Sequence, residues 1–235
     1  MRLDGRENNQ IRPIKITKNF LNKVPTSVLI EFGDTKVLCA SSFEIKQPPF
    51  LLGSEKGWVT AEYSMLPQST QQRVGRERSK VGGRTQEIQR LIGRSLRAVT
   101  NLEKLNKLSV TVDCDVLQAD GGTRTASITG AYVSLSILFR EMLDKGLISE
   151  IPFRDSVSAI STGIINDNIY ADLNYEEDYK AQVDMNFVIT GSGELVEVQG
   201  TAEEKPFSKA LLDEMYNLAS QACESLKNFQ KETLS

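Results

Sequence analysis

The most informative feature of this 235-residue sequence is a residue type that it lacks. It contains no histidine, so no imidazole can act as a base, complete a Ser-His or Cys-His dyad, or bind zinc. Only three cysteines are present, Cys39, Cys114 and Cys223, and they lie far apart in apolar segments. We therefore expect buried thiols, with neither a disulfide framework nor a CxxC metal site. Any catalysis is left to carboxylates, hydroxyls, lysines, arginines and bound ions.

Long apolar runs are missing as well. The longest is four residues, 37–40, whereas a membrane-spanning helix needs about 20. The first ten residues are polar and lack the apolar stretch of a secretory signal. We therefore expect no contact with membranes and a cytoplasmic location. With 40% apolar and 25% charged residues and no Pro/Ser-rich linker, the chain is predicted to form a single domain over residues 1–235.

Charge is distributed unevenly along the chain. The net charge is -3, yet residues 73–97 hold eight basic residues against two acidic ones, which leaves -9 on the rest. Residues 74–84 contain glycine breaks and predict a mobile basic loop. The helix predicted after this loop carries three arginines opposite its apolar face: Arg90, Arg94 and Arg97. Such a stripe is typical of a solvated helix face, but beside a basic loop it favours binding along a phosphate backbone.

Apolar periodicity predicts two similar halves, each with several antiparallel strands followed by an amphipathic helix. In the first half we expect strands over 26–32, 36–40, 58–63 and 108–116 and helices over 86–100 and 126–143. In the second half we expect strands over 157–165, 169–173, 185–190 and 195–199 and a helix that begins near 208. This order predicts an α+β fold with helices packed on sheet faces.

Two glycine turns come directly before predicted helices. In Asp120-Gly-Gly-Thr-Arg-Thr125, the glycines allow a tight turn, and the free N–H groups of the helix start attract an anion. Arg124 adds donors that match phosphate oxygens. The second turn, Gly82-Gly-Arg-Thr85, supplies an arginine that could close on the same anion. Neither is a P-loop, because GxxxxGK[ST] is absent, and a purely structural turn capped by threonine is the alternative.

Five carboxylates lie close together in the second half of the chain: Asp172, Glu176, Glu177, Asp178 and Asp184. Such a group is tolerated when it is solvated or when a hard cation such as Mg²⁺ lies between its members. A solvated acidic loop is therefore one interpretation. A metal site beside a phosphate-binding turn, as phosphoryl transfer requires, is the other.

The segment around the first glycine turn, Leu117-Gln-Ala-Asp-Gly-Gly-Thr-Arg-Thr-Ala-Ser-Ile-Thr-Gly-Ala131, closely resembles the signature of the bacterial ribonuclease PH family. The family's other blocks occur in the same order, from Asp4-Gly-Arg6 to the last helix. They are Glu31-Phe-Gly-Asp-Thr-Lys-Val-Leu-Cys39, Gly57-Trp-Val-Thr-Ala-Glu-Tyr63, Gly82-Gly-Arg-Thr85, Asp184-Met-Asn186 and Glu197-Val-Gln-Gly-Thr-Ala-Glu203. The resemblance therefore covers nearly the whole chain.

This resemblance implies an enzyme, a phosphorolytic 3′ to 5′ exoribonuclease and nucleotidyltransferase that trims tRNA precursors and processes rRNA. It would use inorganic phosphate instead of water and release nucleoside 5′-diphosphates. The implied fold is like the second domain of ribosomal protein S5, with mixed sheets and helices packed on one face. The implied partners are RNA 3′ ends and further copies of the chain in a homohexamer, a trimer of dimers, and no DNA.

The resemblance also assigns the phosphate-binding residues. The family's phosphate-binding arginine in Gly-Gly-Arg-Thr corresponds to Arg84. The family's phosphate-binding Gly-Thr-Arg segment corresponds to Gly122, Thr123 and Arg124. These are the two glycine turns that the residue chemistry already singles out.

Metal-binding and RNA-binding roles are carried over in the same way. The carboxylates credited with catalysis and with binding Mg²⁺ or Mn²⁺ correspond to Asp178 and Asp184, and the loop residues that hold tRNA correspond to Arg73 and Arg76. Gln68 stands where relatives often have another tRNA-binding arginine. We therefore expect weaker RNA affinity or an altered choice of substrate.

Two other functions stay compatible with the sequence. The chain could be a catalytically silent RNA-binding ring subunit, against which the retained carboxylates and phosphate arginines argue. It could also be a metal-dependent nuclease that uses water, which a dedicated anion site disfavours.

Overall fold

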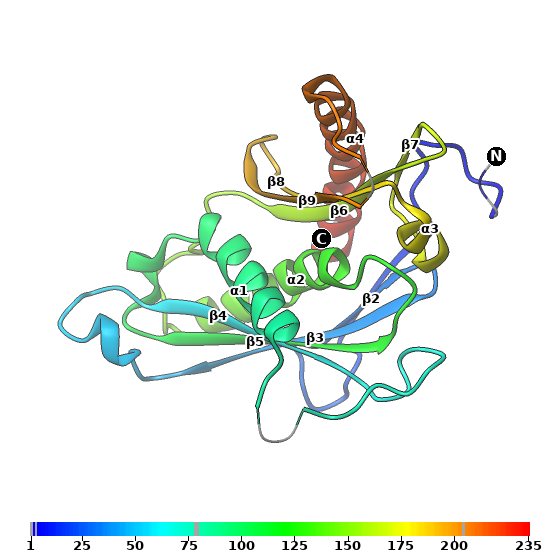
Figure 1. Ribbon diagram of the computed structural model, residues 1–235. Helices are drawn as coiled ribbons and strands as arrows, with labels where there is room; N and C mark the ends of the chain where they lie inside the picture. Colours follow the sequence, from blue (N-terminus) through cyan, green and yellow to red (C-terminus); the bar gives the residue numbers. More distant parts are fainter. Residues whose placement is uncertain (1, 3, 78–79, 204) are drawn as a thin grey trace.

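The computed structural model describes residues 2, 4–77, 80–203 and 205–235, and it contains two β-sheets with helices between and beside them (Figure 1). Arg78 of the predicted basic segment lies outside the described residues. The first sheet has the order β1-β2-β3-β5-β4. Its strands are β1 (Ile14–Lys18), β2 (Val28–Phe32), β3 (Thr35–Glu44), β4 (Trp58–Met65) and β5 (Ser109–Gln118).

The second sheet has the order β7-β6-β8-β9 and is antiparallel throughout. Its strands are β6 (Val157–Ile165), β7 (Asn168–Ala171), β8 (Val183–Thr190) and β9 (Leu195–Ala202). The helices are α1 (Gly83–Ala98), α2 (Thr123–Asp144), α3 (Tyr175–Lys180) and α4 (Lys209–Leu234). Two short 3₁₀ turns, Pro49–Leu51 and Leu102–Leu105, complete the described structure.

Every strand and helix that the sequence predicts is present, and the α+β class is confirmed. The expectation of antiparallel strands was wrong at one place, because β4 and β5 pair in parallel, with α1 as the crossover between them. The three cysteines are buried and free, as predicted. Within the described part of the chain, no helix is long and apolar enough to cross a membrane.

Helix α2 lies between the two sheets, and it positions the turn that precedes it. It packs on β3 of the first sheet and on β6 of the second (Figure 1). Fourteen of its 22 residues are buried, so it lacks the broad polar face of the amphipathic helix predicted here. Its close approach to the first sheet requires glycine, since a Cβ at Gly130 would lie 2.6 Å from Ile30 Cγ2. The start of α2 is therefore held rigidly near both sheets.

Candidate active site

The turn between β5 and α2, Asp120 to Gly122, has the geometry of an anion site. Gly121 and Gly122 have φ values of 72° and 64°, in the left-handed region that glycine adopts without strain. In the described structure, α2 begins with neither a side-chain cap nor an acidic residue in its first turn. Its first N–H groups are therefore free to bind an anion, with the positive end of the helix dipole behind them. We call this turn the phosphate loop.

The side chain of Arg124 is oriented by a row of polar groups that leads away from the phosphate loop. Its Nη1 donates to Gln199 Oε1 at 2.9 Å and lies 3.4 Å from Glu87 Oε1. Gln199 Nε2 donates in turn to Glu197 at 3.0 Å. Glu197 accepts two hydrogen bonds from Arg94, at 3.0 and 2.7 Å. Arg124 is thus held by residues of β9 and α1.

Tyr63 joins the phosphate loop to a neighbouring cavity of about 380 Å³. Its hydroxyl forms a 2.9 Å hydrogen bond with Thr123 Oγ1, and burial raises the pKa of this phenol. Arg76 and Arg84 line the same cavity. The sequence assigns Tyr63 no role. The one signal for it is its place at the end of Gly57-Trp-Val-Thr-Ala-Glu-Tyr63, a block that resembles the family's.

The structure brings Asp178 of α3 and Asp184 of β8 into the electrostatic field of both predicted phosphate arginines. Burial raises the pKa of Asp184 to about 6, the negative charge of Asp178 adds to this rise, and Arg124 and Arg84 oppose it. Partial desolvation likewise raises the pKa of Asp178, against the pull of Arg84 and Arg124. Two cations and two carboxylates, predicted from four separate segments, therefore lie close enough to affect one another's ionisation.

The two carboxylates fit a divalent cation. Asp184 Oδ1 is buried, and among the described residues it has no hydrogen-bond partner. An orphaned, desolvated carboxylate oxygen beside a second carboxylate is suited to Mg²⁺, which needs only one or two protein carboxylates when phosphate and water complete its shell. The described residues contain no cluster of three or more acidic or cysteine side chains that could hold an ion alone. Water, or the oxygens of a bound substrate, would complete the shell of an ion held by Asp178 and Asp184.

The other carboxylates of the predicted acidic cluster pair with basic side chains, so neither interpretation of the sequence, a solvated loop or a metal site, describes the whole cluster. Asp172 and Glu177 are buried in ion pairs with arginines near the N-terminus. Glu176 is exposed and pairs with Lys180 at 3.2 Å. Asp172 and Glu177 each accept four hydrogen bonds, which occupy the lone pairs that a metal would need.

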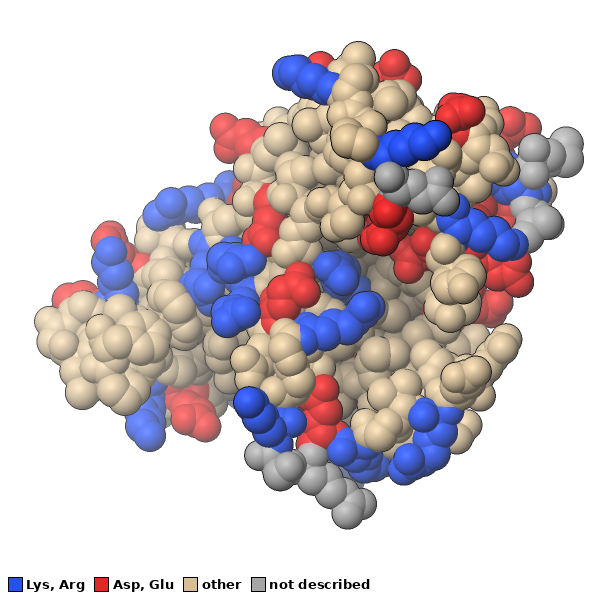
Figure 2. Space-filling view, in the orientation of Figure 1, with Lys and Arg blue, Asp and Glu red and all other residues tan. Residues whose placement is uncertain are grey.

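The described part of the basic loop between β4 and α1 is largely exposed and lies beside the cavity. Arg73 and Arg76 are both exposed, as is Gln68 on the same connection. Figure 2 shows basic side chains gathered on the lower part of this face, where Figure 1 places the loop, next to a hollow. This arrangement suits a chain of phosphates that leads into the site.

The predicted basic stripe does not continue along α1. Arg94 is engaged by Glu197, as described above. Arg97 donates to the Val59 carbonyl at 2.8 Å, and its guanidinium lies over the Trp58 ring, 4.3 Å from the centroid. The continuous phosphate track expected along this helix was therefore wrong, because two of its three arginines bind groups on distant strands.

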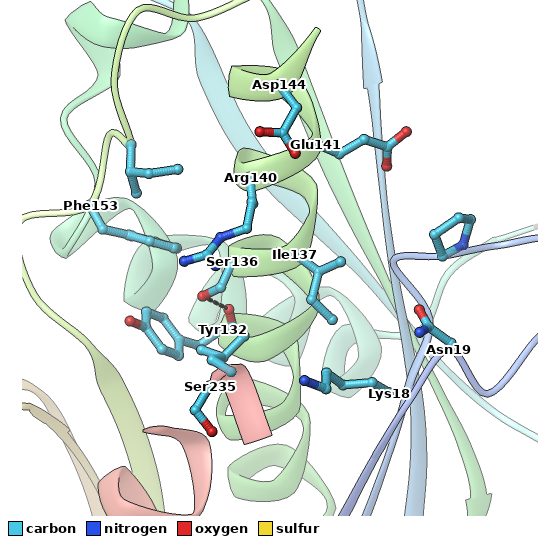
Figure 3. Close-up of a pocket in the computed structure, with 13 residues that line it drawn as sticks. Lys18, Asn19, Tyr132, Ser136, Ile137, Arg140, Glu141, Asp144, Phe153 and Ser235 are labelled. Carbon is cyan, nitrogen blue, oxygen red and sulfur yellow. Dashed lines mark hydrogen bonds between the residues drawn. The ribbon is translucent and has the colours of Figure 1, made fainter. Parts of the chain in front are cut away.

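A second and larger cavity, of about 660 Å³, lies at the far end of α2 (Figure 3). Tyr132, Ser136 and Arg140 of α2 and Phe153 point toward it. None of the predicted phosphate, carboxylate or RNA-binding residues lines it. The chemistry of the lining, and not the volume of the cavity, therefore identifies the candidate active site.

Comparison with known proteins places this geometry in context. Residues 10–140 match the 3′ exoribonuclease family, domain 1, and residues 155–222 match domain 2 of the same family. Ribonucleases PH of Bacillus cereus and Bacillus anthracis are each 54% identical over 237 residues, covering 100% of this chain and 97% of the relative.

Solved structures share the fold at much lower identity. Rice (Oryza sativa) Rrp46 superimposes with a TM-score of 0.80 at 21% identity, covering 99% of both chains. A chain of the Archaeoglobus fulgidus exosome with RNA bound to the active site gives 0.81 at 22% identity, covering 97% of this chain and 91% of that one. These likenesses confirm the expected fold, which is like the second domain of ribosomal protein S5.

Proposed function

Because the chain belongs to the 3′ exoribonuclease family and is a phosphorolytic 3′ exoribonuclease, we propose that it trims the 3′ ends of tRNA precursors and other structured RNAs. Inorganic phosphate is its co-substrate, and nucleoside 5′-diphosphates are the proposed products. The observation that carries the proposal is the shared site of Arg84, Arg124, Asp178 and Asp184. A catalytically silent ring subunit would need neither the two arginines nor the two carboxylates.

In the proposed reaction, an oxygen of inorganic phosphate attacks the phosphorus of the last phosphodiester. The bond from that phosphorus to the 3′ oxygen of the preceding nucleotide breaks, and the released nucleotide carries two phosphates. The proton of the attacking hydrogen phosphate ends on the 3′ oxygen, so the shortened RNA keeps a 3′ hydroxyl. Phosphate is already an anionic nucleophile, so no histidine base is needed. Arg84, Arg124 and the N–H groups that open α2 hold it in line and offset the repulsion between two anions.

We also propose that Asp178 and Asp184 bind Mg²⁺ or Mn²⁺. The buried, unpartnered Oδ1 of Asp184 supports this role. When bound, the ion neutralises charge on the phosphodiester and on the leaving 3′ oxygen. The two carboxylates themselves fix its position relative to the arginines on the phosphate.

RNA binding is proposed to depend on Arg73 and Arg76, so replacing them should weaken it in a salt-dependent way. In Arg73→Ala and Arg76→Ala, each lost phosphate contact makes the negative slope of log K against log salt less steep by about 0.7 for a single-stranded segment. Titrations of labelled tRNA precursor at several salt concentrations measure this slope. Lys209→Ala, at a lysine that is 81% exposed on α4, is the control. An unchanged slope in the loop variants would show that these arginines do not contact RNA phosphates.

We further propose that the chain acts in the cytoplasm. We propose that it assembles as a homohexamer, a trimer of dimers, and that each chain folds as a single domain. Structures of similar fold include an archaeal exosome core, which supports a ring. Ile45, Phe50 and Leu52, between β3 and β4, are exposed apolar side chains suited to a subunit contact. One core cluster draws on both sheets, which supports the single domain. A solution mass of six chains is the expected result.

Reversibility provides a test of the proposed chemistry. With Mg²⁺, an RNA that ends in a 3′ hydroxyl and a nucleoside diphosphate, the enzyme should lengthen the RNA and release inorganic phosphate. Nucleoside triphosphates are the control and should not be used. Shortening of the RNA without any extension, whatever the diphosphate concentration, would contradict a phosphorolytic mechanism.

A further inference from the structure

Arg12, a residue outside the site described above, makes a buried bidentate ion pair with Asp172. Its side chain is only 5% exposed, and that of Asp172 is fully buried. Arg12 Nε and Nη2 donate to the two carboxylate oxygens at 2.9 and 2.6 Å, and the backbone N of Arg12 donates to Oδ2 at 2.7 Å. Asp172 has φ of 55°, a left-handed conformation that aspartate adopts more readily than most residues.

Arg12 also contacts the phosphate loop. Its Nη1 donates to the carbonyl oxygen of Asp120 and, at 3.4 Å, to Thr35 Oγ1. The Thr35 hydroxyl donates to the Gly121 carbonyl at 2.6 Å and accepts from the Asp120 N–H at 2.9 Å. A Cβ at Gly122 would lie 3.1 Å from Arg12 Nη2. Asp120 and Gly121 are therefore hydrogen-bonded to Arg12 or to its neighbour Thr35, and Gly122 lies close to the Arg12 guanidinium.

The opposite side of the same network holds the segment that carries Asp178. Arg2 Nε and Nη2 donate to the Glu177 carboxylate at 2.8 and 2.7 Å, and Arg6 Nη2 lies 3.4 Å from it. Glu177 directly precedes Asp178 and completes the capping box that starts α3. Arg2 and Arg6 both also donate to the carbonyl oxygen of Asp172, at 2.9 and 3.0 Å. Asp172 thus connects Arg12 with α3.

Direct contact between the phosphate loop and the start of α3 makes their spacing tight. A Cβ at Gly121 would lie 2.6 Å from the Leu173 carbonyl oxygen and 2.9 Å from the Tyr175 nitrogen. Tyr175 N–H donates to Asp120 Oδ1 at 3.1 Å. A small shift on either side therefore changes how a phosphate on the loop lies relative to Asp178.

We propose that Arg12 is a positioning residue for phosphorolysis, whose guanidinium sets the spacing between the phosphate loop and Asp178 without touching phosphate or RNA. This rests on the proposed phosphate role of the loop and the proposed metal role of Asp178. The presence of a buried ion pair, Arg12 with Asp172, where apolar side chains could pack instead, is consistent with this role. A buried ion pair gives little net stability over apolar packing, but its several directed hydrogen bonds fix geometry.

The variant Arg12→Lys tests the proposal. Lysine keeps the charge but has one donor nitrogen, which cannot bind Asp172 bidentately and reach Asp120 as well. We expect kcat/KM for phosphate to fall by about 10²-fold, as for a 1 Å misplacement, while KM for RNA changes less than about twofold. Lys15→Gln, at a lysine that is 73% exposed on the neighbouring strand, should have wild-type kinetics.

A binding readout separates positioning from general damage to the fold. Phosphate should raise the thermal midpoint of the wild type, since it binds the folded state. Arg12→Lys, with an unchanged circular dichroism spectrum, should lose most of this rise. Asp172→Asn should act on phosphate in the same way, and the double variant should be no worse than the more impaired single variant.

Two results would overturn the proposal: unchanged phosphate kinetics in a folded Arg12→Lys, or an equal loss of phosphate and RNA binding. Either result with a phosphate-dependent wild type leaves the proposed function intact. A wild type that releases no nucleoside diphosphate would instead count against the proposed function itself.

Discussion

Arg124→Ala is expected to abolish phosphate-dependent cleavage while leaving RNA bound. Arg124 lies in the first turn of α2, directly after the phosphate loop, and its side chain is preorganised by Gln199. Removing one such donor typically costs on the order of 10²-fold or more in rate. We propose that RNA retention depends on the exposed loop arginines Arg73 and Arg76, which the substitution does not touch. Rates at several phosphate concentrations, together with RNA binding, measure the two effects separately.

Two companion variants make this result specific. Arg140→Ala removes an exposed arginine at the far end of the same helix, in the cavity of Figure 3, and should have wild-type rates. Gln199→Ala leaves Arg124 in place but removes its orienting partner, and should give a smaller loss than Arg124→Ala. An equal loss of cleavage and RNA binding in Arg124→Ala would show that the turn is structural and not a phosphate site.

Asp184→Asn is expected to inactivate the enzyme and, without divalent ions, to stabilise its fold. The pKa of Asp184 is about 6 in the fold, against an ordinary value of 3.8. Between these values the folded state binds the proton more tightly, so the stability contributed by this group falls as pH rises from about 4 to 6 and stays low above. Asparagine removes the ionised group, and at pH 7.5 the gain is at most about 3 kcal/mol.

Denaturant unfolding in EDTA and in Mg²⁺, at pH 7.5 and pH 4, measures this prediction. Wild type should be stabilised by Mg²⁺ at pH 7.5, whereas Asp184→Asn should not. In EDTA the advantage of the variant should be present at pH 7.5 and absent at pH 4. Asp213→Asn, at an exposed aspartate of α4, is the control. A variant that is less stable than wild type in EDTA at pH 7.5 would contradict the expected cost of the buried charge. A variant that Mg²⁺ still stabilises would contradict a metal role for Asp184.

How much of the fold the sequence predicts depends on the strength of its periodicity. β5 was predicted because Val110, Val112, Cys114 and Val116 alternate, and all four are buried. β1 was missed because it is short and has only two apolar residues, Ile14 and Ile16, and none of its five residues is buried at this edge of the sheet. α3 was missed because six residues, mostly charged, cannot show an apolar stripe. Its capping box was the one local signal available.

Within the candidate site, local chemistry was predictable and long-range pairing was not. Both glycine turns and the carboxylates are visible in the sequence. The sequence also suggests that Arg84 and Arg124 could act on one anion, but the spacing of these residues does not test that suggestion. The interpretation of α1 as a phosphate track was wrong because the partner of Arg94, Glu197, is 103 residues away. The Arg12–Asp172 pair, 160 residues apart, was missed for the same reason. Such contacts depend on the fold and not on spacing.

The most direct measurement incubates the purified protein and Mg²⁺ with an RNA that has a single-stranded 3′ tail, with and without inorganic phosphate, and identifies the released nucleotide. Nucleoside 5′-diphosphates that appear only with phosphate are the predicted result, since we propose that Arg84 and Arg124 hold phosphate as the nucleophile. Nucleoside monophosphates released at the same rate without phosphate would mean that water is the nucleophile, and would contradict the phosphorolytic site.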